Sequence, residues 1–292
     1  MKIAILSGKG GAGKTMMAVN LAAVIGETVY IDCDVEEPNG RLFLKPQMAE
    51  TKPVYTLLPV FDASKCTGCR KCVDFCRFNA LIFIKDKPMV FDEVCHSCTG
   101  CMLVCPENAI SEKECCVGHV EIGQHNNIRV VTGELNTGEA SGVPVIKAAL
   151  KEGNALATGI DSANNENRKE CDIIIDCPPG SACSVMESIE AADICLLVAE
   201  PTAFGFDNFK MVYELVSLLG KPCGVVINKQ DEIYEPLESF CEQNNLPILA
   251  RIPFSRKIAE LAGKGEIVGE KDYEAERLFR DIYDRIRGGV LI

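Results

Sequence analysis

The sequence of 292 residues has no apolar run long enough to cross a membrane. A transmembrane helix needs about 20 consecutive apolar residues. The opening stretch MKIAILSGKGG also places glycines where a signal peptide would carry its apolar region and cleavage site. We therefore expect a cytoplasmic protein without integral membrane association.

The sequence also lacks the excess of basic residues that favours binding to nucleic acids. It has 30 lysines and arginines against 42 aspartates and glutamates, which gives a formal net charge of -12. A charge of this sign repels the phosphate backbone. We expect no nucleic-acid partner.

Cysteine is abundant, with 17 residues, but the other features of a disulfide-rich secreted domain are missing. Such domains are short and have small hydrophobic cores, whereas 47% of this 292-residue chain is hydrophobic. Metal ligation is therefore the better explanation of the cysteine content.

Short segments rich in Val, Ile and Leu alternate along the chain with segments of helical character. Near-continuous apolar runs are typical of parallel strands covered on both faces, so the alternation predicts an α/β fold with a mostly parallel sheet flanked by helices. The expected strands are 2–7, 28–32, 128–133, 172–176, 194–200, 223–229 and 247–253. The expected helices are 14–25, 143–151, 185–192, 206–219 and 236–244.

This alternation stops between about residues 59 and 112, where cysteines, polar turns and two short apolar segments replace it. The change predicts a small α+β domain, residues 60–112, inserted between two parts of the main domain, residues 1–59 and 113–292. No linker rich in Gly, Ser or Pro flanks the insert. We therefore expect it to pack against its host.

The sequence GKGGAGKT, residues 8–15, matches the phosphate-binding loop G-x-x-x-x-G-K-[ST] and stands between an expected strand and an expected helix. In such a loop, successive backbone N–H groups and the helix N-terminus bind phosphate. Lys14 would neutralise the β and γ phosphates, and Thr15 would ligate Mg²⁺. The predicted nucleotide-binding loop consists of Gly8, Lys9, Gly10, Gly11, Ala12, Gly13, Lys14 and Thr15.

Lys9 is a second lysine at the start of this loop. KGGAGKT resembles the deviant Walker A motif of the MinD/ParA family, which also contains the nitrogenase iron protein and the Mrp-type cluster carriers. The resemblance implies a P-loop ATPase that uses ATP and Mg²⁺. It also implies a nucleotide-dependent homodimer, or a heterodimer with a related ATPase, in which each Lys9 reaches the phosphates bound to the other subunit.

Three acidic residues lie where the resemblance implies catalytic and Mg²⁺-binding roles. In YIDCDVEEPN, residues 30–39, Asp32 would sit near Mg²⁺ and Asp34 would orient the attacking water. In IIIDCPPG, residues 173–180, Asp176 occupies the Walker B position and would hold Mg²⁺ through water. The resemblance thus implies a catalytic set of Lys9, Lys14, Asp34 and Asp176.

Asn228 stands at the end of the expected strand 223–229, where this family usually reads adenine. The same residues also match the guanine-reading motif of GTPases, with Asn228 and Lys229 followed by Asp231. We favour ATP as the nucleotide.

Two cysteine runs in the insert follow the bacterial ferredoxin pattern C-x₂-C-x₂-C-x₃-C. In this pattern three thiolates of one run bind one [4Fe–4S] cluster, and the fourth binds the other cluster. The predicted ligands are Cys66, Cys69, Cys72 and Cys105 for one cluster, and Cys95, Cys98, Cys101 and Cys76 for the other. A pair of zinc sites is the alternative, but these usually join two C-x₂-C units over longer spacers.

The other nine cysteines lie mostly in or beside apolar strands, and we expect most of them to be small buried hydrophobes. Mrp-type carriers bind a transferable cluster between subunits through a C-x-x-C pair, and this chain has no such pair outside the insert. Cys183 lies close to where the nitrogenase iron protein has a cysteine of its intersubunit cluster. It lacks the second cysteine that such a cluster would need.

The whole chain is similar to MinD-superfamily ATPases that carry an inserted ferredoxin domain. This resemblance implies that ATP turnover is coupled to electron transfer or redox sensing, with a redox or metallocofactor protein as partner. A cluster-assembly or carrier ATPase is the alternative. A MinD-like spatial organiser is less favoured, because the segment 273–287 has helical spacing but not the basic face of a membrane anchor, so we expect it to pack against the sheet.

Overall fold

The computed structural model describes residues 1–85, 87–159, 171–289 and 291. Within these ranges, nine strands form one sheet in the order β11-β10-β9-β1-β8-β2-β7-β6-β3. The strands from β11 to β7 are parallel, and β6 and β3 are antiparallel to their neighbours. The strands are β1 Lys2–Leu6, β2 Thr28–Asp32, β3 Gln47–Phe61, β6 Ile110–His125, β7 Ile128–Leu135, β8 Asp172–Asp176, β9 Ile194–Ala199, β10 Cys223–Asn228 and β11 Ile248–Ile252.

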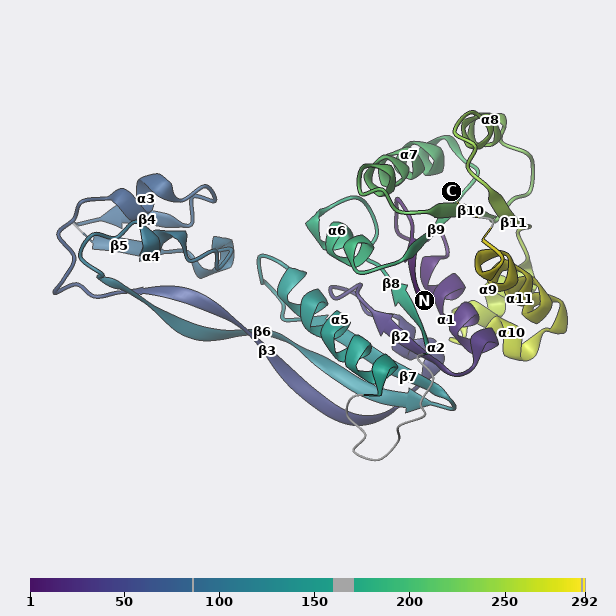
Figure 1. Cartoon of the computed structure of the whole chain (residues 1–292), viewed down its shortest axis with the longest axis horizontal. Helices are drawn as coiled ribbons and strands as arrows, with labels where there is room; N and C mark the ends of the chain where they lie inside the picture. Colours follow the sequence, from purple (N-terminus) through teal and green to yellow (C-terminus); the bar gives the residue numbers. More distant parts are fainter. Residues whose placement is uncertain (86, 160–170, 290, 292) are drawn as a thin grey trace.

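Helices cover both faces of this sheet (Figure 1), so the predicted α/β fold is confirmed. Neighbouring residues of a strand point to opposite faces: Ile3 and Ile5 belong to one buried core, Ala4 and Leu6 to the other. On the first face lie α1 Lys14–Ile25, α2 Gly40–Leu44, α9 Arg256–Gly263, α10 Val268–Lys271 and α11 Tyr273–Arg287. On the second lie α5 Val143–Thr158, α6 Cys183–Glu190, α7 Ala203–Leu218 and α8 Glu235–Gln243.

Helix α5 extends seven residues beyond its predicted end at residue 151. Its apolar face continues through Gly153 and Ala157, which are buried, and the helix stops at Gly159, whose φ of 70° is left-handed. A glycine in this conformation is a common helix terminator.

Helix α11 packs beside α1 with Phe279, Ile282 and Ile286 buried in the first core. It also contacts β11, so the prediction that the segment 273–287 packs against the sheet is confirmed. Asp272 begins the helix by accepting hydrogen bonds from the backbone N–H groups of Glu274 and Ala275. None of the helices in the described ranges is both long and apolar enough to cross a membrane.

Two long strands, β3 and β6, were not predicted from the sequence. They pair along their whole length, whereas β6 pairs with β7 only from Gly118 to His125. Beyond that point β3 and β6 continue as a two-stranded ribbon (Figure 1). The register shifts between Val54 and Tyr55, opposite Val117, where the ribbon leaves the sheet.

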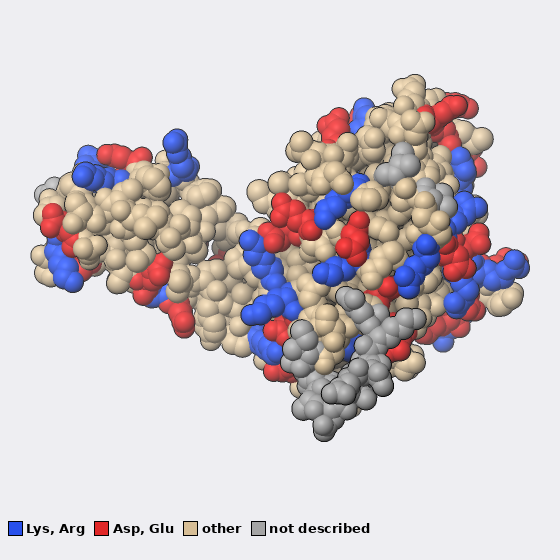
Figure 2. All heavy atoms as spheres, in the orientation of Figure 1, with Lys and Arg blue, Asp and Glu red and all other residues tan. Residues whose placement is uncertain are grey.

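The ribbon carries a small lobe, residues 62–109, at its far end (Figure 1). Figure 2 shows this lobe as a separate mass joined to the main domain by a narrow neck, with Lys, Arg, Asp and Glu interspersed on the visible face. The insert therefore does not lie flat on its host, contrary to expectation, but is held out on the ribbon, and residues 92–97 face the main domain across a gap. The two strands of the ribbon hydrogen-bond to each other, so the ribbon can hold a lobe away from the domain without a separate linker.

The lobe is built from two similar halves. A hairpin of two short strands lies beside two one-turn helices that contact each other. Ala80, Leu81 and Ala109 are buried beneath them. The elements of the lobe are α3 Lys71–Phe75, β4 Leu81–Ile84, β5 Lys87–Val90, a 3₁₀ turn Asp92–Val94 and α4 Gly100–Leu103.

Candidate functional site

The loop of residues 7–13 joins β1 to α1 and is packed tightly against its neighbours. A Cβ atom added to Gly8 would lie 2.2 Å from the backbone oxygen of Asn208 in α7. A Cβ added to Gly13 would lie 2.2 Å from Nδ2 of Asn228, and the φ of Gly13 is 99°. Glycine is therefore required at both positions, because a side chain would open the loop.

Two residues at the end of β10, Asn228 within the strand and Lys229 directly after it, hold this loop from outside. The Asn228 side chain donates a hydrogen bond to the carbonyl of Ala12 at 2.8 Å. The Lys229 ammonium donates to the carbonyl of Gly11 at 2.6 Å. The sequence predicts that Asn228 contacts a nucleotide base, and it does not predict this hydrogen bond to the loop. The available signal was the position of β10 in the parallel sheet, since such strands end at the same edge as β1.

Lys14, Asp34 and Asp176 come together directly beneath the loop. Lys14 Nζ lies 2.5 Å from Asp176 Oδ1 and 3.6 Å from Asp34 Oδ2. Tyr30 donates its hydroxyl to Asp176 Oδ2 at 2.9 Å. Burial opposes the charge on Lys14, but Asp176 and Asp34 outweigh that cost and raise its pKa above the ordinary value. Lys14 is therefore a permanent cation facing two acids.

Asp32 lies behind this group and shapes the loop that carries Asp34. Its two carboxyl oxygens accept hydrogen bonds from the backbone N–H groups of Asp34 at 3.2 Å and Gly40 at 2.9 Å. Burial and the neighbouring Asp176 raise the pKa of Asp32 to about 8. Burial also raises the pKa of Asp34, to about 6, although Lys14 acts in the opposite direction. A divalent cation bound here would lower both values.

A cleft of about 940 Å³ opens above these residues, and we call it the nucleotide cleft. Its volume lies at the upper end of the range of about 300–1,000 Å³ that is usual for ligand pockets. Asp34 and Thr15 line it, whereas Asp32 and Asp176 are fully buried below. The rest of the lining includes Lys9, Gly10, Gly11, Gly13, Lys14, Glu36, Glu37, Ser141, Pro178, Pro179, Cys183 and His96.

Lys9 makes its contacts within its own chain. Its ammonium group lies 2.6 Å from Glu200 Oε2 and 5.4 Å from the ring centroid of Phe204. Lys9 therefore turns toward the start of α7, and Glu200 is a partner that sequence reasoning missed.

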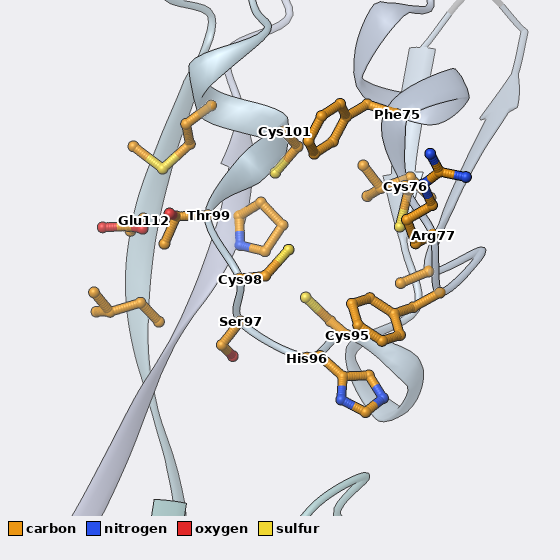
Figure 3. Close-up of a pocket in the computed structure, with 16 residues that line it drawn as sticks. Phe75, Cys76, Arg77, Cys95, His96, Ser97, Cys98, Thr99, Cys101 and Glu112 are labelled. Atoms are coloured by element: carbon orange, nitrogen blue, oxygen red, sulfur yellow. The ribbon is translucent and has the colours of Figure 1, made fainter.

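The lobe contains two cavities, each lined by one of the predicted sets of four cysteines. The first cysteine cavity is lined by Cys66, Cys69, Cys72 and Cys105. The second cysteine cavity, drawn in Figure 3, is lined by Cys95, Cys98, Cys101 and Cys76. In both cavities three thiols come from one run and the fourth comes from the other.

The backbone that presents these thiols repeats between the two halves of the lobe. Arg70 and Thr99 occupy equivalent positions before α3 and α4, and both have left-handed φ values, 62° and 59°. These turns bring the second and third cysteines of each run to the same cavity. In the first cavity, Cys105 Sγ also accepts a hydrogen bond from the N–H of Ala109 at 3.3 Å.

The thiols fit a thiophilic metal centre. Burial raises the pKa of Cys72, of Cys95 and of Cys101, the last to about 11. These groups therefore hold their protons at neutral pH until a metal displaces them. Four thiolates around one cavity suit either zinc or an iron–sulfur cluster, and the three-plus-one exchange between two runs matches the arrangement of two-cluster ferredoxins.

The remaining cysteines divide into a buried and a surface group. The buried group confirms the expectation of small core residues and contains Cys33, Cys171, Cys177, Cys195, Cys223 and Cys241. Cys115 is half-buried, and Cys116 and Cys183 are exposed. A separate group of His119, Glu121 and Glu134 lies close enough together to hold an ion, but Arg41 already pairs with both glutamates.

Known proteins are similar to most of the chain and, in one case, to a short part of it. A sequence profile of the CobQ/CobB/MinD/ParA nucleotide binding domain matches residues 3–268. An uncharacterized protein of Methanocaldococcus jannaschii is 27% identical over 277 residues, which cover 91% of this chain and 90% of that protein. An uncharacterized ferredoxin of the same organism is 44% identical over 55 residues, which cover 18% of this chain and 71% of the ferredoxin.

The fold is also similar to solved structures. One is the septum site-determining protein MinD, complexed with Mg-ADP, from Pyrococcus horikoshii. The two chains superpose with a TM-score of 0.55 and 19% sequence identity, over 98% of this chain and 95% of the other.

Proposed function

This chain belongs to the CobQ/CobB/MinD/ParA nucleotide-binding family, and from that membership we propose that it is an ATPase of the deviant Walker A type that carries two [4Fe–4S] clusters. We assign residues 1–59 and 113–292 to the ATPase domain and residues 60–112 to an inserted ferredoxin-like domain. We further propose that a nucleotide-dependent dimer couples ATP turnover to electron transfer or redox sensing.

The arrangement beneath the loop supports the ATPase assignment. Lys14 is positioned by Asp176 and Asp34 at the floor of the nucleotide cleft. The γ-phosphate of ATP would offer Lys14 a new anionic partner, and Thr15 and Asp176 would hold Mg²⁺, directly and through water. Bound Mg²⁺ would neutralise the charge that develops on the transferred phosphoryl group.

Asp34 is the residue best placed to orient the attacking water. It lines the nucleotide cleft, and its Oδ2 lies 3.6 Å from the ammonium group of Lys14, beside which the γ-phosphate would bind. Asp32 supports it by accepting a hydrogen bond from its backbone N–H at 3.2 Å.

The two cysteine cavities carry the iron–sulfur assignment. Each cavity is lined by three thiols of one run and one thiol of the other run. Two zinc sites, each formed by one run, would not require that exchange. The similarity to a ferredoxin over 55 residues supports the same assignment. Clusters bound there would supply one-electron chemistry, while the cysteines hold them within the lobe.

The continuity of β6 supports coupling between the two parts. This strand begins at Ile110, five residues after Cys105, and ends at His125, paired with β7 of the nucleotide-binding sheet. A displacement of β7 would therefore move the base of the ribbon that carries the lobe.

An experiment with the loaded protein separates electron transfer from cluster delivery. We expect Mg-ATP to change the reduction potential of the clusters or their rate of electron transfer, while iron stays bound. The protein would be incubated anaerobically with an apo-acceptor, and iron transfer and cluster redox state would be followed together. Transfer of the clusters to the acceptor without any redox change would show that the protein is a cluster carrier.

Replacing Lys9 with alanine should impair ATP-dependent dimerisation and hydrolysis while leaving nucleotide binding largely intact. The proposed role of Lys9 is a phosphate contact across the dimer interface, whereas Lys14 contacts phosphate within the subunit. Light scattering with and without Mg-ATP measures the dimer. Glu200→Gln is the matched control, because it removes the intramolecular partner at 2.6 Å and keeps Lys9 itself. A Lys9→Ala variant that still dimerises with ATP would contradict the proposed contact of Lys9 with phosphate across the dimer interface.

A further inference from the structure

His96 lies at the junction of three cavities. It lines the second cysteine cavity (Figure 3), the nucleotide cleft, and a gap of about 430 Å³ between the lobe and the main domain. No cysteine of the lobe lines the nucleotide cleft among the residues that the structure describes. His96 is thus the point at which the lobe meets the nucleotide cleft.

The gap has a lobe side and a domain side. On the lobe side it is lined by Asp92, Glu93, Cys95, His96 and Ser97, and on the domain side by residues 137–141, Val143, Pro144 and Cys183. Cys183 lines the nucleotide cleft as well. His96 and Cys183 therefore border the same two spaces from opposite sides.

Cys183 is connected to the phosphate-binding loop by a short segment. This segment leaves β8 after Asp176, which contacts Lys14, and its Gly180 donates a backbone hydrogen bond to the carbonyl of Ser7 at 3.0 Å. Cys183 then begins α6. A bound phosphate would attract Lys14 away from Asp176 and change the shape of the loop. The segment between Asp176 and Cys183 would then move, and with it the side of the gap that faces His96.

His96 also contacts the residues that form the second cysteine cavity. It follows Cys95 in the chain, and its ring stacks on Phe78 with centroids 3.9 Å apart and an interplanar angle of 18°. Phe78 lines that cavity too. A change in the position of the stacked pair alters how solvent reaches the cavity, and solvent exposure is one of the factors that set cluster potentials.

The first cysteine cavity has no comparable connection. Within residues 1–85, 87–159, 171–289 and 291, none of the residues that line it also lines the gap or the nucleotide cleft. The position equivalent to His96 in the first run is Thr67, which also follows the first cysteine of its run and lines the first cavity. The two halves of the lobe thus differ in their relation to the nucleotide.

We propose that His96 is a positioning residue that couples the nucleotide cleft to the second cysteine cavity, so that the cluster held by Cys95, Cys98, Cys101 and Cys76 responds to nucleotide. The cluster in the first cavity, whose lining shares no described residue with the nucleotide cleft or the gap, does not respond. This inference rests on the proposed function, since it assigns the coupling to one of the two clusters.

The test uses the full chain loaded with both clusters and the magnesium complex of a non-hydrolysable ATP analogue. We expect the analogue to change backbone amide exchange in residues 92–99 but not in residues 65–70. In a redox titration followed by electron paramagnetic resonance, we expect it to shift the potential of one cluster only. His96→Ala should abolish that shift, and Thr67→Ala should leave it unchanged.

Controls separate coupling from folding. His96→Phe keeps a planar ring to stack on Phe78, so it should retain the shift even if His96→Ala lowers the iron content. An equal shift in the wild type and in His96→Ala, or a change in exchange at residues 65–70 with none at 92–99, would overturn the inference. A chain that binds no iron or no nucleotide would instead refute the proposed function.

Discussion

Replacing Lys14 with alanine should lower ATP turnover at least about a hundredfold, the usual effect of removing one group that stabilises transition-state charge. Lys14 is the buried cation at the floor of the nucleotide cleft, with its ammonium group 2.5 Å from Asp176 and 3.6 Å from Asp34. Without the Lys14 ammonium group, the negative phosphates would lie beside Asp34 and Asp176, and the repulsion between them would not be neutralised. Phosphate release measures the turnover. Calorimetric titration with Mg-ATP measures the nucleotide affinity, which should fall as well.

A second variant distinguishes this loss from unfolding. Lys14→Ala alone leaves Asp176 buried without its cation, and breaking a buried pair in this way typically costs about 3–5 kcal/mol of stability. The double variant Lys14→Ala/Asp176→Asn removes both charges and should recover much of the free energy of unfolding. It should not recover nucleotide binding. ATP affinity and turnover near those of the wild type in the single variant would refute the assignment.

Removing one thiol from either cysteine cavity should halve the iron content of the protein. The wild type should hold about eight irons and eight sulfides, the content of two [4Fe–4S] clusters, and Cys105→Ser or Cys76→Ser should leave about four irons. Cys183→Ser, an exposed cysteine outside the lobe, should leave all eight. Iron and sulfide analysis after anaerobic purification gives these values.

Double variants test the exchange of the fourth ligand between the two runs. Cys66→Ser/Cys105→Ser removes two ligands of one cavity and should still leave about four irons. Cys95→Ser/Cys105→Ser removes one ligand from each cavity and should leave almost none. The reverse pattern would mean that each run binds its own metal centre. Zinc in stoichiometric amounts, with no iron after anaerobic reconstitution, would eliminate the iron–sulfur proposal altogether.

The α/β fold was predictable because its signals are local. Parallel strands buried on both faces must be apolar at nearly every position, and β8 and β10 are fully buried. The phosphate-binding loop depends on glycines that no other residue can replace without strain, as at Gly13, whose φ is 99°. Both features are visible within a few residues of sequence.

The ribbon of β3 and β6 was not predictable in the same way. Most of β3 is exposed or half-buried, so hydrophobic periodicity carries little information there. The strand exists because it pairs with residues 110–125, and the paired residues are separated by 49 positions at Phe61 and by 77 at Gln47. The absence of a Gly/Ser linker led to the expectation of a docked insert. The actual connection is a paired ribbon, and pairing between distant segments cannot be read from composition.

The backbone of the phosphate loop, the parallel core and the spacing of the eight lobe cysteines follow from local sequence, since each depends on neighbouring residues and on steric rules. The partners of these residues depend on how the chain folds in three dimensions. The tertiary structure paired Lys14 with Asp176 across 162 positions, turned Lys9 toward Glu200, gave Asn228 a contact with the loop across 216 positions, and set His96 beside the nucleotide cleft. Side-chain partners so distant in the chain are chosen by how the sheet edge and the lobe come together, and no local pattern records that choice.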